Sequence, residues 1–143
     1  MKKVLILLVV MLATASSVLS QSGMELDSSS DYVYEPGEIF YIIIQIDQLQ
    51  IEEIKTELEE LKDQPEFELT KVSKLPIKDM TYGDITILVV RRFQNFIYAE
   101  YYVEIINKKS IMGINEALII SQINYRKFLK KQDLEEYKNF IEN

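Results

Sequence analysis

The segment from Ile39 to Ile46 constrains the fold more than any other part of this sequence. It is almost wholly apolar and rich in β-branched residues. Such a run fits a strand that is covered on both faces better than it fits an edge strand. We therefore expect residues 39–46 to form a central strand of a sheet.

A helix is predicted directly after this strand. Asp47 offers an N-cap oxygen, and Gln50 stands three residues later, where a capping-box partner belongs. Pro65 ends the pattern because proline does not continue a helix. The apolar positions recur at helical spacing: Ile51, Ile54, Leu58 and Leu61.

The middle of the chain predicts further strands. Phe67–Val72 alternates well enough for a short strand, and Pro76 confines the next stretch to a connection or an edge. Asp84–Phe93 and Phe96–Asn107 are dense in Ile, Val, Tyr and Phe. We expect these two segments to form a long hairpin that reverses near Gln94-Asn95.

The C-terminal part predicts a last strand and a helix. Ala117–Ile120 fits a short strand, and Ser121 fits the N-cap of a helix that runs towards the C-terminus. In an alternative, 115–121 is helical and the helix starts at Asn115. A second cap is expected near Gln132-Asp133.

Together these segments predict an α+β domain over residues 38–143. We expect a mainly antiparallel sheet of about four to five strands, with a helix after the first strand and a C-terminal helix. Both helices are expected to cover the same face of the sheet.

The N-terminus has the features of a secretory signal peptide. Lys2 and Lys3 precede an apolar run from Val4 to Leu12, and the small residues of 13–20 follow. The run is shorter than the roughly 20 residues that cross a bilayer. We expect cleavage after Ser20, a periplasmic or secreted product without a stable membrane anchor, and a flexible acidic leader over residues 21–37.

Composition excludes several kinds of chemistry. The chain has no cysteine and no histidine, so it has no disulfide, no thiolate zinc site and no Ser/His or Cys/His dyad. We expect no cofactor and no catalytic activity. A carboxylate-dependent hydrolase stays as an alternative, because Asp79 and Asp84 flank Tyr82-Gly83. Turn formation explains these residues equally well.

Charge is uneven along the chain. From Gln21 to Thr70 there are 14 acidic residues and two lysines, whereas from Lys71 onward there are nine acidic and 12 basic residues. The acidic helix and the basic segments either lie near one another or form a bipolar surface that docks a partner. A nucleic acid partner is not expected, because the domain is acidic overall.

The acidic leader contains a spacing that resembles a calcium loop. Its candidate ligands occupy positions one, three, five, nine and twelve of such a loop: Asp27, Ser29, Asp31, Glu35 and Glu38. The sixth position is Tyr32 where a calcium loop has glycine, and Pro36 stiffens the end. A solvated tail is therefore the favoured interpretation.

One face of the predicted strand over Phe96–Asn107 is the candidate contact surface. It comprises Phe96, Tyr98, Glu100, Tyr102 and Glu104. Tyrosine brings a large apolar area with a polar tip, which is typical of interfaces. In the alternative, these tyrosines lie beneath a helix. We expect a binding domain with a protein partner or a second copy, and a self-associating envelope subunit that pairs through the hairpin edge is the other possibility.

Overall fold

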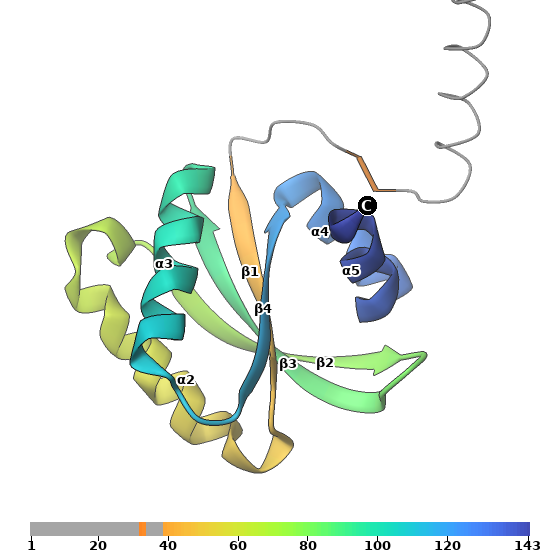
Figure 1. The fold of residues 1–143 in the computed structure, drawn as a ribbon, viewed down its shortest axis with the longest axis horizontal. Coiled ribbons are helices and arrows are strands. Elements are labelled where there is room, and N and C mark those ends of the chain that lie inside the picture. The colour runs from red at the N-terminus through yellow and green to blue at the C-terminus, as the bar shows by residue number, and fades with distance from the viewer. Residues whose placement is uncertain (1–31, 34–38) are drawn as a thin grey trace, which may run out of the picture. The chain divides into compact units, whose positions relative to one another are not determined.

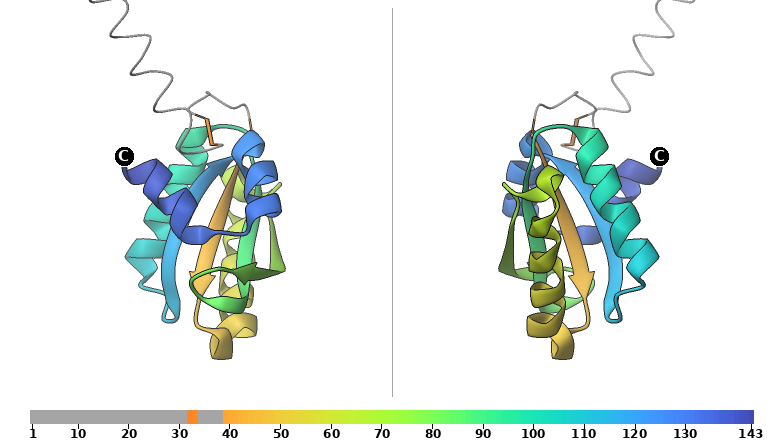
Figure 2. Two further views of the ribbon diagram at one scale, coloured as in Figure 1. Left: turned by 90° about the vertical axis from the view of Figure 1, so that its right-hand side faces the viewer. Right: turned by 90° about the vertical axis from the view of Figure 1, so that its left-hand side faces the viewer.

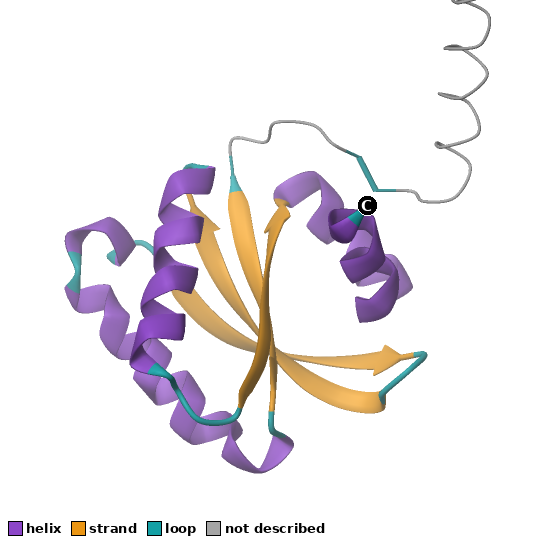
Figure 3. Ribbon diagram, in the orientation of Figure 1, coloured by secondary structure: helices purple, strands orange, loops and turns teal. Residues whose placement is uncertain are grey.

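The computed structural model describes residues 32–33 and 39–143, which belong to one compact unit beginning at Tyr32. Its sheet has four antiparallel strands in the order β2-β3-β1-β4 (Figures 1 and 3). The strands are β1 (Phe40–Ile46), β2 (Lys71–Asp79), β3 (Gly83–Phe93) and β4 (Ile114–Ser121). The helices are α2 (Ile51–Glu60), α3 (Phe96–Lys109), α4 (Gln122–Lys131) and α5 (Leu134–Glu142), with short 3₁₀ turns η1 (Gln48–Gln50), η2 (Leu61–Asp63) and η3 (Pro65–Phe67). The predicted α+β class, the antiparallel sheet and both predicted helices are confirmed.

The order of the elements gives the sheet a split βαβ topology. Strands and helices alternate as β1-α2-β2-β3-α3-β4, and β1 lies between β3 and β4. This arrangement is the ferredoxin-like one. The central position predicted for residues 39–46 is confirmed, because β1 pairs on both sides. The topology alone does not specify a function.

Helices cover both faces of the sheet (Figure 2). Successive side chains of a strand point to opposite faces, and Ile42, Ile43 and Ile44 are all at most 1% exposed. Ile42 and Ile44 belong to the core beneath α2 and α3, whereas Ile43 belongs to the core beneath α4 and α5. The expectation that the helix after β1 and the C-terminal helix share a face is therefore wrong.

The strand predicted over Phe67–Val72 begins and ends later, as β2. Phe67 lies in η3 and is fully buried. β2 is an edge strand, in which Pro76 stands opposite Thr86 of β3. An edge tolerates a residue without an N–H donor on its outer side. Pro76 is therefore in an edge strand, one of the two positions predicted for it.

The predicted hairpin of Asp84–Phe93 with Phe96–Asn107 is wrong. β3 pairs with β1 and β2, and the second segment is the helix α3. Asn95 caps this helix by accepting a hydrogen bond from the Tyr98 N–H at 2.9 Å. The buried residues of α3 follow helical spacing: Ala99, Tyr102 and Ile106.

The C-terminal predictions largely hold. The strand around 117–120 is β4, so the alternative that makes 115–121 helical is wrong. Ser121 caps α4 by accepting from the Asn124 N–H at 3.3 Å. The interruption at Gln132-Asp133 is present, because Asp133 caps α5 by accepting from the Glu136 N–H at 2.9 Å.

Most of the predicted leader, and the whole predicted signal peptide over residues 1–20, lie outside the described residues. Tyr32 and Val33 fall within the predicted leader, yet Tyr32 is 5% exposed and belongs to the core beneath α4 and α5. These two residues therefore belong to the folded domain.

Candidate functional site

The residues of the predicted contact surface do not share one face. They lie on α3, where each residue is turned by about 100° from the one before it. Phe96 and Tyr98 are 45% and 39% exposed, whereas Tyr102 is fully buried. Glu100 and Glu104 are exposed. The surface predicted from strand alternation is therefore split between the protein core and solvent.

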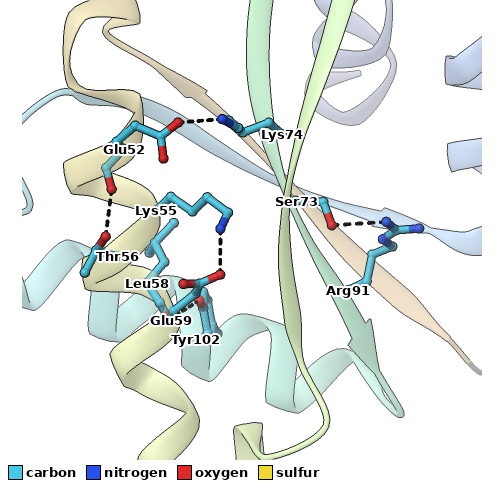
Figure 4. Close-up of polar contacts among 9 residues, drawn as sticks. All are labelled: Glu52, Lys55, Thr56, Leu58, Glu59, Ser73, Lys74, Arg91 and Tyr102. Carbon is cyan, nitrogen blue, oxygen red and sulfur yellow. Dashed lines mark hydrogen bonds and ion pairs between the residues drawn. The ribbon is translucent and has the colours of Figure 1, made fainter.

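Tyr102 belongs to the core that joins α2 and α3. Its ring centroid lies 4.9 Å from that of Phe67 and 5.3 Å from that of Phe93. Its hydroxyl donates a hydrogen bond to the Leu58 carbonyl oxygen at 3.2 Å (Figure 4). Burial raises the pKa of the Tyr102 phenol far above its usual range. Tyr102 therefore stabilises the fold and is not available to a partner.

The start of α3 and the loop before β2 instead present a group of exposed apolar side chains. We call this group the apolar surface. Ile97 is 71% exposed and Leu69 is 72% exposed, which is far more than large apolar side chains usually show. The residues of the apolar surface are Leu69, Phe96, Ile97, Tyr98 and Tyr101.

A hollow brings Leu69 together with Tyr98, although 28 residues lie between them in the chain. It has a volume of about 430 Å³ and is lined by Pro65, Glu66, Glu68, Leu69, Arg92, Phe93, Gln94 and Tyr98. A second hollow, of about 600 Å³, is lined by Ile39, Leu69, Arg92 and Gln94. The two hollows share three residues, so together they form a groove beside the start of α3. We call it the Leu69 groove.

The lining of the Leu69 groove combines apolar and charged side chains. Leu69, Phe93 and Tyr98 supply apolar area, while Glu66, Glu68 and Arg92 stand around it. This composition suits contact with an apolar side chain whose neighbours are polar or charged.

Two residues of the apolar surface have aromatic neighbours in the body of the domain. Phe96 contacts Phe40 of β1 with ring centroids 5.5 Å apart, and Tyr101 contacts the buried Phe67 at 5.6 Å. Phe67 N–H also donates to the Gln64 carbonyl oxygen at 2.9 Å, which fixes the turn before Leu69. Phe96 and Tyr101 are therefore held by aromatic neighbours, although neither of them lines the Leu69 groove.

Ile97, Tyr101 and Leu69 were missed by the sequence analysis. Reading residues 96–107 as a strand put Ile97 and Tyr101 on its apolar face. The helical spacing of Ala99, Tyr102 and Ile106 puts them outside. Leu69 had no local signal, because its neighbour Tyr98 is distant in the sequence.

Acidic and basic helices lie on opposite faces of the sheet. α2 carries five glutamates and one lysine, and α4 carries four basic residues and no acidic one. Lys74 of β2 pairs with Glu52 of α2, and Lys55 pairs with Glu59 at 2.8 Å within α2 (Figure 4). One basic strand residue therefore approaches α2, as expected if the acidic helix and the basic segments lie near one another, while α4 lies across the sheet from α2.

Arg91 lies at the margin of the sheet. It is exposed, and its Nη2 donates to the Ser73 hydroxyl of β2 at 3.1 Å (Figure 4). Simple alternation along β3 would place Phe93 on the same face as Arg91. A bulge in the β1–β3 pairing, where Tyr41 stands opposite Arg91 and Phe40 opposite Phe93, turns Phe93 into the core beneath α2 and α3 instead.

Asp79 has a structural role at the turn between β2 and β3. It is 4% exposed, and its Oδ1 accepts hydrogen bonds from the N–H groups of Thr81 and Tyr82 at 2.8 and 2.9 Å. Its Oδ2 accepts from the Leu134 N–H at 2.8 Å and so holds the start of α5. Both carboxylate oxygens are thus engaged with backbone, while Asp84 is exposed. This arrangement corresponds to turn and cap formation.

The predicted calcium ligands Asp27, Ser29, Asp31, Glu35 and Glu38 all lie outside the described residues. Within residues 32–33 and 39–143, no three side chains of the metal-binding types come together. In the same part of the chain, no helix combines the length and the apolar character that crossing a bilayer requires.

Comparison with known proteins adds no assignment. No family model matches the chain, no curated protein matches it, and no solved structure matches it.

Proposed function

We propose that this chain is an extracytoplasmic binding domain without catalytic activity, and that the apolar surface contacts a protein partner. The observation that carries the proposal is the Leu69 groove, which Tyr98 lines, together with the exposed Ile97 in the same first turn of α3. Large apolar side chains that are exposed together on a soluble domain are typical of interaction sites.

The proposed location rests on the sequence of the N-terminus. A short basic segment, an apolar run and small residues before Gln21 have the order of a signal peptide. On this basis the working protein is the chain from Gln21, with Ser20 as the last residue removed.

Charge favours a partner segment that is apolar and basic. Glu66 and Glu68 line the Leu69 groove with a single basic residue, Arg92, and Glu100 is exposed on α3. A basic residue beside the partner's apolar anchor would therefore be attracted, while an acidic one would be repelled. The formal net charge of −7 disfavours a polyanionic partner such as nucleic acid.

The proposal is tested by capture of partners on the immobilised chain 21–143, followed by affinity measurement with each captured protein after purification. The test variant is Leu69→Ala with Ile97→Ala, whose side chains are 72% and 71% exposed. The control is Leu49→Ala with Met112→Ala, which removes apolar side chains that are 94% and 79% exposed elsewhere. Because all four side chains are largely exposed, we expect every variant to fold.

We expect the test variant to bind the partner about 30-fold more weakly, as for loss of an interface hot spot. The control variant is expected to bind within about twofold of the parent. If both double variants bind like the parent, or if both lose binding equally, the apolar surface is not the site.

A further inference from the structure

The C-terminal helices hold residues 32 and 33, which contribute no strand to the sheet. The ring of Tyr32 lies against Tyr137 and Phe140 of α5, with centroid distances of 4.9 and 5.5 Å. Lys131 of α4 places its Nζ 5.8 Å from the centroid of the same ring. Tyr32 is 5% exposed, so it fills an aromatic pocket on the α4–α5 side.

Asn124 of α4 binds the backbone of the next residue in both directions. The Val33 N–H donates to Asn124 Oδ1 at 3.0 Å, and Asn124 Nδ2 donates to the Val33 carbonyl oxygen at 2.9 Å. An amide side chain that binds both the N–H and the carbonyl oxygen of one residue makes the same two hydrogen bonds that a paired strand would make. It recognises the main chain of that residue and makes no demand on its side chain.

The site does not depend on this segment for its position. Asn124 is 4% exposed, and its own N–H is bound to the Ser121 hydroxyl that caps α4. Phe128 of α4 and Leu134 of α5 pack in the core against the sheet. The Tyr137 hydroxyl also donates to the Ile119 carbonyl oxygen of β4 at 2.8 Å. Asn124 and Tyr137 are therefore held by contacts with α4 and with the sheet that do not involve this segment.

We propose that the α4–α5 surface is a peptide-binding site, which takes a segment of another protein that carries an aromatic residue and binds the backbone of the residue after it. The pocket of Tyr137, Phe140 and Lys131 selects the aromatic ring by edge contact and by cation–π attraction. Asn124 sets the register by binding the backbone of the following residue.

In the free protein, Tyr32 and Val33 occupy this site themselves. A segment of the same chain has a high effective concentration at its own site, of the order of millimolar. A partner segment must therefore displace it, so the chain carries its own competitor. This site lies across the sheet from the apolar surface, and the inference does not rest on the proposed function.

The site is tested with the chain 21–143 and a fluorescent peptide that reproduces residues 30–35, by fluorescence anisotropy. In the variant Tyr32→Ala the aromatic pocket loses its internal occupant, and Val33 keeps only its two backbone hydrogen bonds to Asn124. We therefore expect saturable binding of the peptide, which supplies both the ring and the backbone. The unsubstituted chain is expected to bind about tenfold more weakly, because its own Tyr32 competes. A peptide with alanine in place of Tyr32 serves as the matched control and is expected not to bind.

The role of Asn124 is tested in the peptide as well as in the protein, because Asn124→Leu alters a buried residue. A peptide with N-methylvaline at Val33 lacks the N–H that donates to Oδ1, while the protein is unchanged. We expect the N-methylated peptide to bind Tyr32→Ala protein at least tenfold more weakly than the parent peptide does. The double variant Tyr32→Ala with Asn124→Leu is expected to bind the parent peptide at least tenfold more weakly than Tyr32→Ala does. The proposal is overturned if the parent peptide does not bind Tyr32→Ala protein whose circular dichroism spectrum is unchanged. It is also overturned if the N-methylated peptide binds as tightly as the parent peptide.

Discussion

Replacing Gly113 by alanine is the most informative perturbation of the fold. Gly113 joins α3 to β4 with a φ of +90°, a conformation that costs a residue with a Cβ about 1–2 kcal/mol. A Cβ at this position would lie 2.1 Å from Gln50 Oε1 and 2.9 Å from Ile54 Cδ1. The Gly113 carbonyl oxygen also accepts from the Asp47 N–H at 2.7 Å, which ties this loop to the start of η1.

The expected loss is the sum of strain and crowding. Forcing an extra group into a packed site costs about 1–3 kcal/mol. With the strain of the positive φ, we expect Gly113→Ala to lower the free energy of unfolding by about 2–5 kcal/mol. This is a large part of the roughly 5–15 kcal/mol that a domain usually has.

Gly83 provides a matched control at the turn between β2 and β3. Its φ is +75°, and among the described residues no atom comes within 4 Å of a Cβ built there. Gly83→Ala should therefore report strain alone, about 1–2 kcal/mol. Urea unfolding followed by far-ultraviolet circular dichroism gives both losses.

A rescue variant separates crowding from strain. Gln50→Ala removes the atoms nearest to the added Cβ, so Gly113→Ala should cost less in that background than in the parent. If Gly113→Ala and Gly83→Ala lower stability equally, and Gln50→Ala brings no relief, the close approach of α2 to this loop is refuted.

Asp79→Ala is expected to lower the free energy of unfolding by about 3 kcal/mol, because the buried Leu134 N–H and two turn N–H groups lose their acceptor. Asp84→Ala, at an exposed position, should change it by less than about 0.5 kcal/mol, and equal losses in urea unfolding would contradict the structural role of Asp79. Burial raises the pKa of Tyr102 above its unfolded value of about 10, so its contribution to stability is fully present below that pH and is lost as the pH rises further. Tyr102→Phe should therefore reduce the fall in the urea midpoint between about pH 9 and about pH 11, and an unchanged fall would argue against a buried phenol. Asn95→Ala should cost about 1 kcal/mol through loss of the α3 cap, whereas Gln94→Ala, which removes no cap, should cost little in the same assay.

The sequence predicted the elements whose signals are local. The apolar run at 39–46 identified the central strand because both faces of a strand in this position are covered and need apolar residues. Asp133 and Ser121 marked helix starts because a capping oxygen must stand directly before the helix. Asp47 was also identified as a cap, but it caps the 3₁₀ turn η1, where it accepts a hydrogen bond from the Leu49 N–H at 3.0 Å. Gln50 does not close the predicted capping box, because its side chain lies against Gly113.

The segment from 96 to 107 was mispredicted because it satisfies two periodicities. Its apolar residues alternate as in a strand, and its β-branched and aromatic content favours one. The positions of Ala99, Tyr102 and Ile106 also repeat at helical spacing. Packing against β1 and α2 decides between the two patterns, and this information is not local.

The candidate sites were beyond sequence reasoning for a similar reason. Leu69 and Tyr98 meet only because η3 and α3 lie side by side. Val33 and Asn124 are 91 positions apart, and their contact depends on α4 covering the sheet. The aromatic content of the segment predicted an interface at Phe96 and Tyr98. It could not predict that Leu69, Ile97 and Tyr101 are exposed near them.

The side-chain contacts of the C-terminal segment reach both edges of the sheet. The Gln132 side chain accepts the Lys78 N–H of β2 at 2.8 Å, and the Tyr137 hydroxyl binds the Ile119 carbonyl oxygen of β4. Exposed strand edges are templates for pairing between molecules. Because α4 and α5 follow all four strands in the chain, a nascent molecule has a bare sheet face and open edges until this segment has emerged. Chains truncated before Gln122 should therefore aggregate, and complete folding must wait for the residues that are made after the sheet.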